Sequence, residues 1–213
     1  MRRIACPWVA AALLAGTAVH AETFSFVTDP FFGTNVLTTP GRQIVGGEVF
    51  VDFEIGTDLF AFENLAFGVG DDVLFANGLA EDLPAGDVNV IVLQTTDNDA
   101  DPGTPFGAGN AANLIAGQVA APSPGFFVYF NSGLSLPRLV YSPDLSDNTA
   151  DLKILARMTN LAGQSDALAT FTAANFSIVP EPSPPLLVAV SAALLAGREV
   201  RRRVRGRGDA ARG

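Results

Sequence analysis

Residues 126–141 read FFVYFNSGLSLPRLVY, and this stretch decides the expected fold. Its two ends, residues 126–130 and 136–141, are rich in aromatic and β-branched side chains, which favour extended strands. The intervening Asn131-Ser132-Gly133 is a turn-forming triplet. The stretch therefore predicts a β-hairpin, in which two neighbouring antiparallel strands are joined by a short turn.

Further strand-like runs occur on both sides of this hairpin, separated by turns rich in Gly, Pro and Asp. They cover residues 23–27, 48–55, 59–62, 73–75, 88–95, 152–158, 167–173 and 176–179. In the clearest run, apolar and acidic residues alternate, which predicts one buried face and one solvent face. The apolar face has Val49, Val51, Phe53 and Ile55, and the other has Glu48, Asp52 and Glu54, with Phe50 as the apolar exception.

One short helix is expected, with Asn110 capping residues 111–118. No long amphipathic helices separate the strand-like runs, which argues against a parallel α/β sheet. We therefore expect residues 22–178 to form an all-β domain, an antiparallel β-sandwich of jelly-roll or immunoglobulin-like type. The connection over residues 96–124 is long, and loops of this length usually carry function or cover a sheet edge.

Charge is segregated along the chain. The 213 residues have a net charge of −9, yet residues 22–180 contain nineteen acidic and four basic residues, which gives 4 − 19 = −15. The other nine basic residues, all arginines, lie towards the two ends. Because binding nucleic-acid phosphates needs Lys and Arg, no nucleic-acid partner is expected for this acidic body.

The residues with the most versatile side-chain chemistry lie near the start of the chain. Cys6, Trp8 and His20 are the only residues of their types. A body that begins at Glu22 therefore lacks the side chains for disulfides, Cys/His zinc sites and His-dependent nucleophilic catalysis. On this ground we expect no catalytic residues and a protein that is not an enzyme.

The N-terminus has the three parts of a secretory signal peptide. Arg2 and Arg3 precede an apolar, helix-forming stretch over residues 9–19, and small residues follow. Val19 and Ala21 occupy the −3 and −1 positions of a cleavage site. We expect residues 1–21 to be removed and the mature chain to begin at Glu22.

Residues 179–213 form a tail of different composition. Val179 is followed by Pro180-Glu181-Pro182, an apolar segment at residues 184–197 and an arginine-rich end. The apolar segment is predicted to be a short transmembrane helix, because the twelve residues 186–197 would span about 18 Å of a hydrocarbon core of about 30 Å. The arginines favour the cytoplasmic side, so the body is expected to lie outside the inner membrane.

This tail resembles the PEP-CTERM protein-sorting signal of Gram-negative bacteria, which is also catalogued as an ice-binding-protein C-terminal domain. The resemblance implies that Pro180, Glu181 and Pro182 are recognised by an exosortase-type processing enzyme. It also implies anchoring in the inner membrane on the periplasmic side, followed by export to the cell surface or extracellular matrix with exopolysaccharide. We accordingly expect a non-enzymatic surface or matrix protein.

An acidic loop is the candidate cation site. Asp97, Asp99 and Asp101 alternate within a turn-forming segment, and alternating carboxylates can surround a hard cation such as Ca²⁺. The loop departs from an EF-hand, because the glycine comes at Gly103, one place late, and position twelve is Ala108. A solvated loop that keeps the protein soluble is the alternative interpretation.

Two further functions remain open. Tyr129 and Tyr141 could stack on a sugar if their hydroxyl groups keep them near the surface, which would make the body a Ca²⁺-dependent carbohydrate-binding or adhesion module. A pair of the many carboxylates could instead serve a glycoside hydrolase as acid and base. The absence of Trp from the body weighs against the hydrolase, because such sites tend to use Trp and Tyr for sugar stacking.

Overall fold

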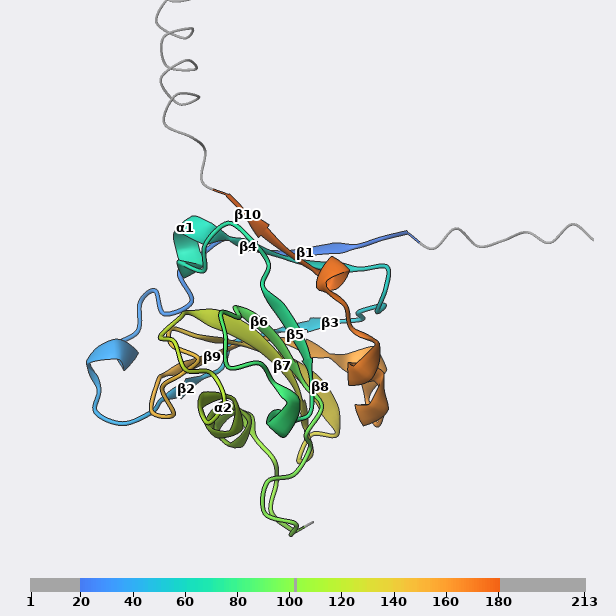
Figure 1. Cartoon of the computed structure of the whole chain (residues 1–213). Coiled ribbons are helices and arrows are strands. Elements are labelled where there is room, and N and C mark those ends of the chain that lie inside the picture. Colours follow the sequence, from blue (N-terminus) through green and yellow to red (C-terminus); the bar gives the residue numbers. More distant parts are fainter. Residues whose placement is uncertain (1–19, 102, 181–213) are drawn as a thin grey trace, which may run out of the picture.

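The computed structural model describes residues 20–101 and 103–180, which form a mainly β protein (Figure 1). The strands are β1 (Thr23–Phe26), β2 (Ile44–Val45), β3 (Val49–Val51), β4 (Leu59–Glu63), β5 (Phe75–Gly78), β6 (Val90–Leu93), β7 (Gly125–Asn131), β8 (Leu136–Ser142), β9 (Leu152–Met158) and β10 (Phe176–Val179). The α-helices are α1 (Asn64–Phe67) and α2 (Ala108–Ala116). The 3₁₀ helices are η1 (Val36–Thr38), η2 (Ala80–Asp82), η3 (Thr159–Leu161), η4 (Ser165–Thr170) and η5 (Ala173–Asn175).

The predicted hairpin is confirmed as β7 and β8. The two strands pair antiparallel from Gly125, opposite Ser142, to Asn131, opposite Leu136. The turn is held by the Asn131 side chain, whose Oδ1 accepts a hydrogen bond of 2.9 Å from the backbone N–H of Leu134. Strand β9 adds to β8, again antiparallel, with an irregularity between Leu139 and Val140.

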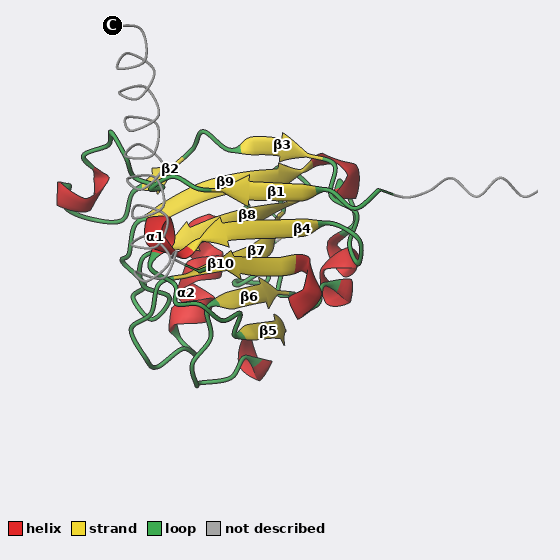
Figure 2. Ribbon diagram, turned by 90° about the horizontal axis from the view of Figure 1, so that it is seen from above, coloured by secondary structure: helices red, strands yellow, loops and turns green. Residues whose placement is uncertain are grey.

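The strands form two sheets (Figure 2). The smaller sheet has the order β1-β4-β10, and the larger has the order β2-β9-β8-β7-β6-β5, with β3 also pairing with β9. Side chains from both sheets join in one apolar cluster, which includes Phe60 and Phe62 of β4 and Phe126 of β7. A second cluster lies between the opposite face of the larger sheet and α2, which covers that face in Figure 1.

The prediction of an antiparallel arrangement is wrong for most of the described strands. Of their eight pairings, only β7–β8 and β8–β9 are antiparallel, and the other six are parallel. The missing long helices had argued against parallel strands, because such strands need a crossover connection. Here only β5–β6 and β6–β7 are parallel pairs of consecutive strands, joined by a segment with η2 and by one with α2. The other four parallel pairs join strands that are separated in the chain by further strands. The long segment at residues 96–124 is therefore a crossover that covers a sheet face.

Two strand predictions change in detail. Residues 165–170 form η4 rather than a strand, and the Asn77 side chain donates hydrogen bonds of 3.0 Å to the carbonyls of Leu168 and Phe171. Within the run at residues 48–55, only β3 pairs with β9. Beyond it, the side chain of Asn160 binds the backbone N–H and C=O of Phe53 in place of a neighbouring strand. The predicted helix is present, but α2 begins at Ala108, and Asn110 lies within its first turn.

Several predictions concern residues outside those described. They are the first nineteen residues of the predicted signal peptide (residues 1–21), the transmembrane segment 184–197 and the arginine-rich end. None of the helices within residues 20–101 and 103–180 has the length and apolar character needed to cross a bilayer.

Candidate functional site

A backbone bulge between β2 and β3 positions the most distinctive polar contacts of the described chain. Val45 of β2 pairs with Lys153, and Val49 of β3 pairs with Ala156. The chain therefore advances four residues from Val45 to Val49 while β9 advances three, which leaves one extra residue in the bulge. Such a bulge redirects side chains and is common near functional sites. Gly47 makes it possible, because its φ of +93° lies in the left-handed region that favours glycine.

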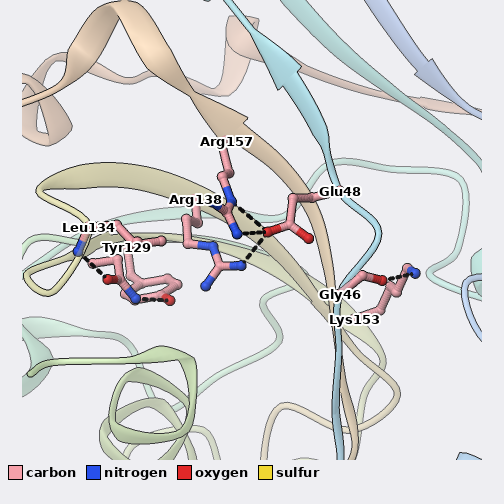
Figure 3. Close-up of polar contacts among 8 residues, drawn as sticks. Gly46, Glu48, Tyr129, Leu134, Arg138, Lys153 and Arg157 are labelled. Atoms are coloured by element: carbon pink, nitrogen blue, oxygen red, sulfur yellow. Dashed lines mark hydrogen bonds and ion pairs between the residues drawn. The ribbon is translucent and has the colours of Figure 1, made fainter.

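The bulge turns Glu48 inward onto two arginines (Figure 3). Glu48 Oε1 lies 2.6 Å from Nη2 of Arg138 and 2.5 Å from both Nε and Nη2 of Arg157. The side chain of Glu48 is 7% exposed and that of Arg138 is 12% exposed. The prediction that Glu48 faces solvent with Asp52 and Glu54 is therefore wrong, because the bulge breaks the two-residue alternation of the strand.

The arginines keep Glu48 ionised. Burial alone would raise the pKa of Glu48, but hydrogen bonds from its own backbone N–H and from Arg157 and Arg138 lower that pKa to about 2. A carboxyl group with this pKa holds no proton near neutral pH and cannot act there as a general acid. The cluster of Glu48, Arg138 and Arg157 therefore ties the bulge to β8 and β9.

The two arginines belong to a row that crosses the larger sheet. Tyr129 pairs with Arg138, and Arg138 pairs with Arg157. Arg157 also lies over the exposed ring of Phe50, at 5.2 Å from its centroid. Nε of Arg138 is buried and, within the described residues, has no hydrogen-bond partner.

All four basic residues of the acidic body are used in internal contacts. Arg42 binds the carbonyl oxygens of Gly109, Asn148 and Ala150 and Oδ1 of Asn113. Lys153 Nζ donates a hydrogen bond of 2.6 Å to the carbonyl of Gly46 (Figure 3). In contrast, fourteen of the nineteen carboxylic side chains between Glu22 and Pro180 belong to exposed residues. The body therefore presents a strongly anionic surface.

A shallow groove of about 390 Å³ lies beside the bulge. Residues of β1, of the loop that follows β1, of the bulge and of β9 line it. Phe32 on this loop is 85% exposed, and Val49 is 48% exposed. Asp29 and Lys153 add one carboxylate and one ammonium group to the lining. An exposed ring next to charged groups is suited to a ligand with both apolar and polar faces.

The predicted tyrosine site is wrong in its geometry. Tyr129 is fully buried and Tyr141 is 6% exposed. Their hydroxyl groups find partners inside the protein: Tyr129 accepts a hydrogen bond of 3.0 Å from Asn131, and Tyr141 donates one of 2.9 Å to the carbonyl of Phe67. Burial raises the pKa of both, that of Tyr141 to about 12. Polar partners in the core thus replace the solvent that the sequence interpretation assumed.

The predicted cation loop is exposed and built from successive turns. Oδ1 of Asp97, Asp99 and Asp101 each accepts a hydrogen bond from the backbone N–H two residues later, at 2.9–3.1 Å. The hydrogen bond from the backbone N–H of Asp99 is the main cause that lowers the pKa of Asp97. Among the described residues, no group of three or more His, Cys, Asp or Glu side chains is arranged to hold a metal ion.

The predicted sorting motif begins where the described fold ends. Strand β10 ends at Val179, and the next residue, Pro180, is exposed. Glu181 and Pro182 lie outside the described residues.

Comparison of the chain with protein-family models, with curated proteins and with solved structures found no match. The described residues, taken by their fold, are those of a mainly β protein with two sheets. The Glu48 cluster was not found from the sequence, although the scarcity of basic residues was a usable signal. A body with four cations among nineteen carboxylates is expected to use each cation in a specific contact.

Proposed function

We propose that this chain is an exported, non-enzymatic protein of the cell surface or extracellular matrix, sorted by its C-terminal tail. The observation that carries the proposal is the position of the Pro180-Glu181-Pro182 motif. Strand β10 ends at Val179, and Pro180 directly after it is exposed, which suits access by a processing enzyme. In this account an exosortase-type enzyme cuts near the motif after the tail has held the chain in the inner membrane.

The body has features that suit a role outside the cell. A matrix protein needs no active site, and in the described part of the chain the cluster of Glu48, Arg138 and Arg157 holds the bulge against β8 and β9. The exposed carboxylates favour association with anionic exopolysaccharide through bridging divalent cations such as Ca²⁺. The shared core between the two sheets supports a β-sandwich as the body's architecture.

Variants of the motif test the sorting proposal. In the native host, Glu181→Ala should leave the chain in the inner-membrane fraction, whereas the wild type should reach the cell surface or medium. Ser183→Ala is the matched control, because it alters the same segment outside the tripeptide. Equal release of the Glu181→Ala variant and the wild type would contradict the proposal.

The groove beside the bulge favours carbohydrate binding as a second candidate function. Its exposed Phe32 ring can pack on the apolar face of a sugar, and Lys153 can contact a sugar carboxylate. Binding to a glycan array should then depend on Ca²⁺ if the aspartate loop contributes, and it should be lost in Phe32→Ala. Val27→Ala removes another exposed apolar side chain outside the groove lining and is the control. Silence across the array would reject this second candidate.

A further inference from the structure

A buried carboxylate lies at the start of the predicted mature chain. Asp58 is only 4% exposed, and both of its carboxylate oxygens are used. Oδ1 accepts a hydrogen bond of 2.8 Å from the backbone N–H of Glu22, and Oδ2 accepts one of 2.8 Å from that of Glu54. Burying a carboxylate is costly unless a positive charge or several hydrogen bonds compensate it.

Asp58 connects the strands of the smaller sheet. Its backbone carbonyl accepts a hydrogen bond of 3.1 Å from Asn175, which directly precedes β10. The next residue, Leu59, donates its N–H to the carbonyl of Glu22 at 2.9 Å. Glu22 is therefore held at both its N–H and its C=O by the residues that begin β4.

The charge balance at Asp58 is incomplete in the uncleaved chain. Within residues 20–101 and 103–180, the ion pairs are those of Glu48 with Arg138 and Arg157, and none involves Asp58. The partner at Oδ1 is a neutral peptide N–H, and it belongs to the residue that follows the predicted cleavage site. His20, Ala21 and Glu22 are exposed, so the new terminus meets solvent on its outer side.

We propose that Asp58 is a binding site for the free α-ammonium group of Glu22, formed when the bond between Ala21 and Glu22 is hydrolysed. Hydrolysis converts the Glu22 N–H, 2.8 Å from Asp58, into an ammonium group, so a buried carboxylate gains a cation without a new contact. The remaining ammonium protons face solvent. Removal of the signal peptide thereby fixes β1 against β4 and stabilises the mature fold over its precursor. This inference rests on the proposed export, because it requires cleavage at this bond.

The charge must lie at residue 22 for this pairing. A chain that retains one additional residue has an amide at Glu22 and carries its ammonium group one residue further out, about 3.5 Å away along an extended backbone. Cleavage one bond earlier, between His20 and Ala21, therefore removes the ion pair while preserving the hydrogen bond from Glu22.

The test compares two full-length genes, each exported and processed by the host. One is the natural chain, and the other has a serine inserted between Ala21 and Glu22, which keeps Val19 and Ala21 at the −3 and −1 positions. Asp58→Asn is made in both, and mass spectrometry establishes each mature N-terminus. In the chain that begins at Glu22, Asp58→Asn should lower the thermal midpoint by about 5 °C or more. In the chain with the additional serine, the same substitution should have a clearly smaller effect.

Glu54→Gln is the matched control, because it removes an exposed carboxylate four residues away and should behave alike in both chains. If Asp58→Asn prevents folding, acylation of the α-amino group is measured instead in the two chains with Asp58 intact. The amine should react more slowly in the chain that begins at Glu22. Equal effects of Asp58→Asn, or equal amine reactivity, overturn the ion pair but leave export intact. A natural mature chain that begins at a residue other than Glu22 overturns the ion pair alone, whereas a chain that retains residues 1–21 contradicts export as well.

Discussion

The two faces of the larger sheet are covered in different ways. One face packs against the smaller sheet through aromatic rings, with Phe62 of β4 and Phe126 of β7 stacked at 3.6 Å between centroids. The other face packs against small and aliphatic residues of α2 and, further along the strands, carries the row of Tyr129, Arg138 and Arg157. The aromatic face provides apolar burial, whereas on the other face Arg138 and Arg157 bind Glu48 and so fix the bulge and the register of β3.

The largest loss is expected on the aromatic face. Phe62 is fully buried, so Phe62→Ala removes a ring that contacts both sheets and should cost about 3–5 kcal/mol of the free energy of unfolding. Phe62→Leu keeps most of the apolar volume and should cost less. Chemical denaturation of both variants measures the two values, and equal stability of Phe62→Ala and the wild type would contradict this assignment of the core.

Removing the carboxylate of the cluster of Glu48, Arg138 and Arg157 should have the next largest effect. Glu48→Gln leaves Arg138 and Arg157 without a counter-charge and should destabilise the fold by roughly 3 kcal/mol. Asp52→Asn changes an exposed carboxylate on the same segment and is the control. If the two variants lose equal stability, the cluster has no special role.

The same carboxylate predicts a specific pH dependence. The pKa of Glu48 is lowered from 4.5 to about 2 in the folded protein, so its contribution is fully present above the unfolded pKa. That contribution is lost as the pH falls from about 4.5 to about 2. The wild type should therefore lose its stability advantage over Glu48→Gln within this window. An advantage that stays constant down to pH 2 would argue against the lowered pKa.

The smallest effect is expected in the bulge backbone. Gly47→Ala places a side chain at a φ of +93° and should cost about 1 kcal/mol, because alanine is strained there. Gly86→Ala is the control, since its φ lies outside the positive region and its new Cβ meets nothing within 4 Å. A neutral Gly47→Ala would show that the bulge relaxes without cost.

The sequence predicted those parts of the fold that depend on local signals. The β7–β8 hairpin follows from two aromatic runs around Asn131-Ser132-Gly133, and the alternation in β9 gave its bounds. Parallel pairing could not be predicted in the same way, because β1, β4 and β10 are far apart in the chain and their register has no local signal.

The candidate sites illustrate the same limit. The alternation at residues 48–55 placed Glu48 in solvent, because a pattern of period two cannot show that the backbone bulges between Val45 and Val49. The hydroxyl groups of Tyr129 and Tyr141 suggested exposure, but Asn131 and the carbonyl of Phe67 bind them inside the core. Each error comes from a partner that is brought close only by tertiary structure.

Mass spectrometry of the natively produced protein tests the central claim, that the chain is exported and processed at both ends, most directly. The account predicts a mature form that begins at Glu22 and ends near Pro180, without the arginine-rich terminus. A surface or matrix form that retains the C-terminal arginines would contradict it.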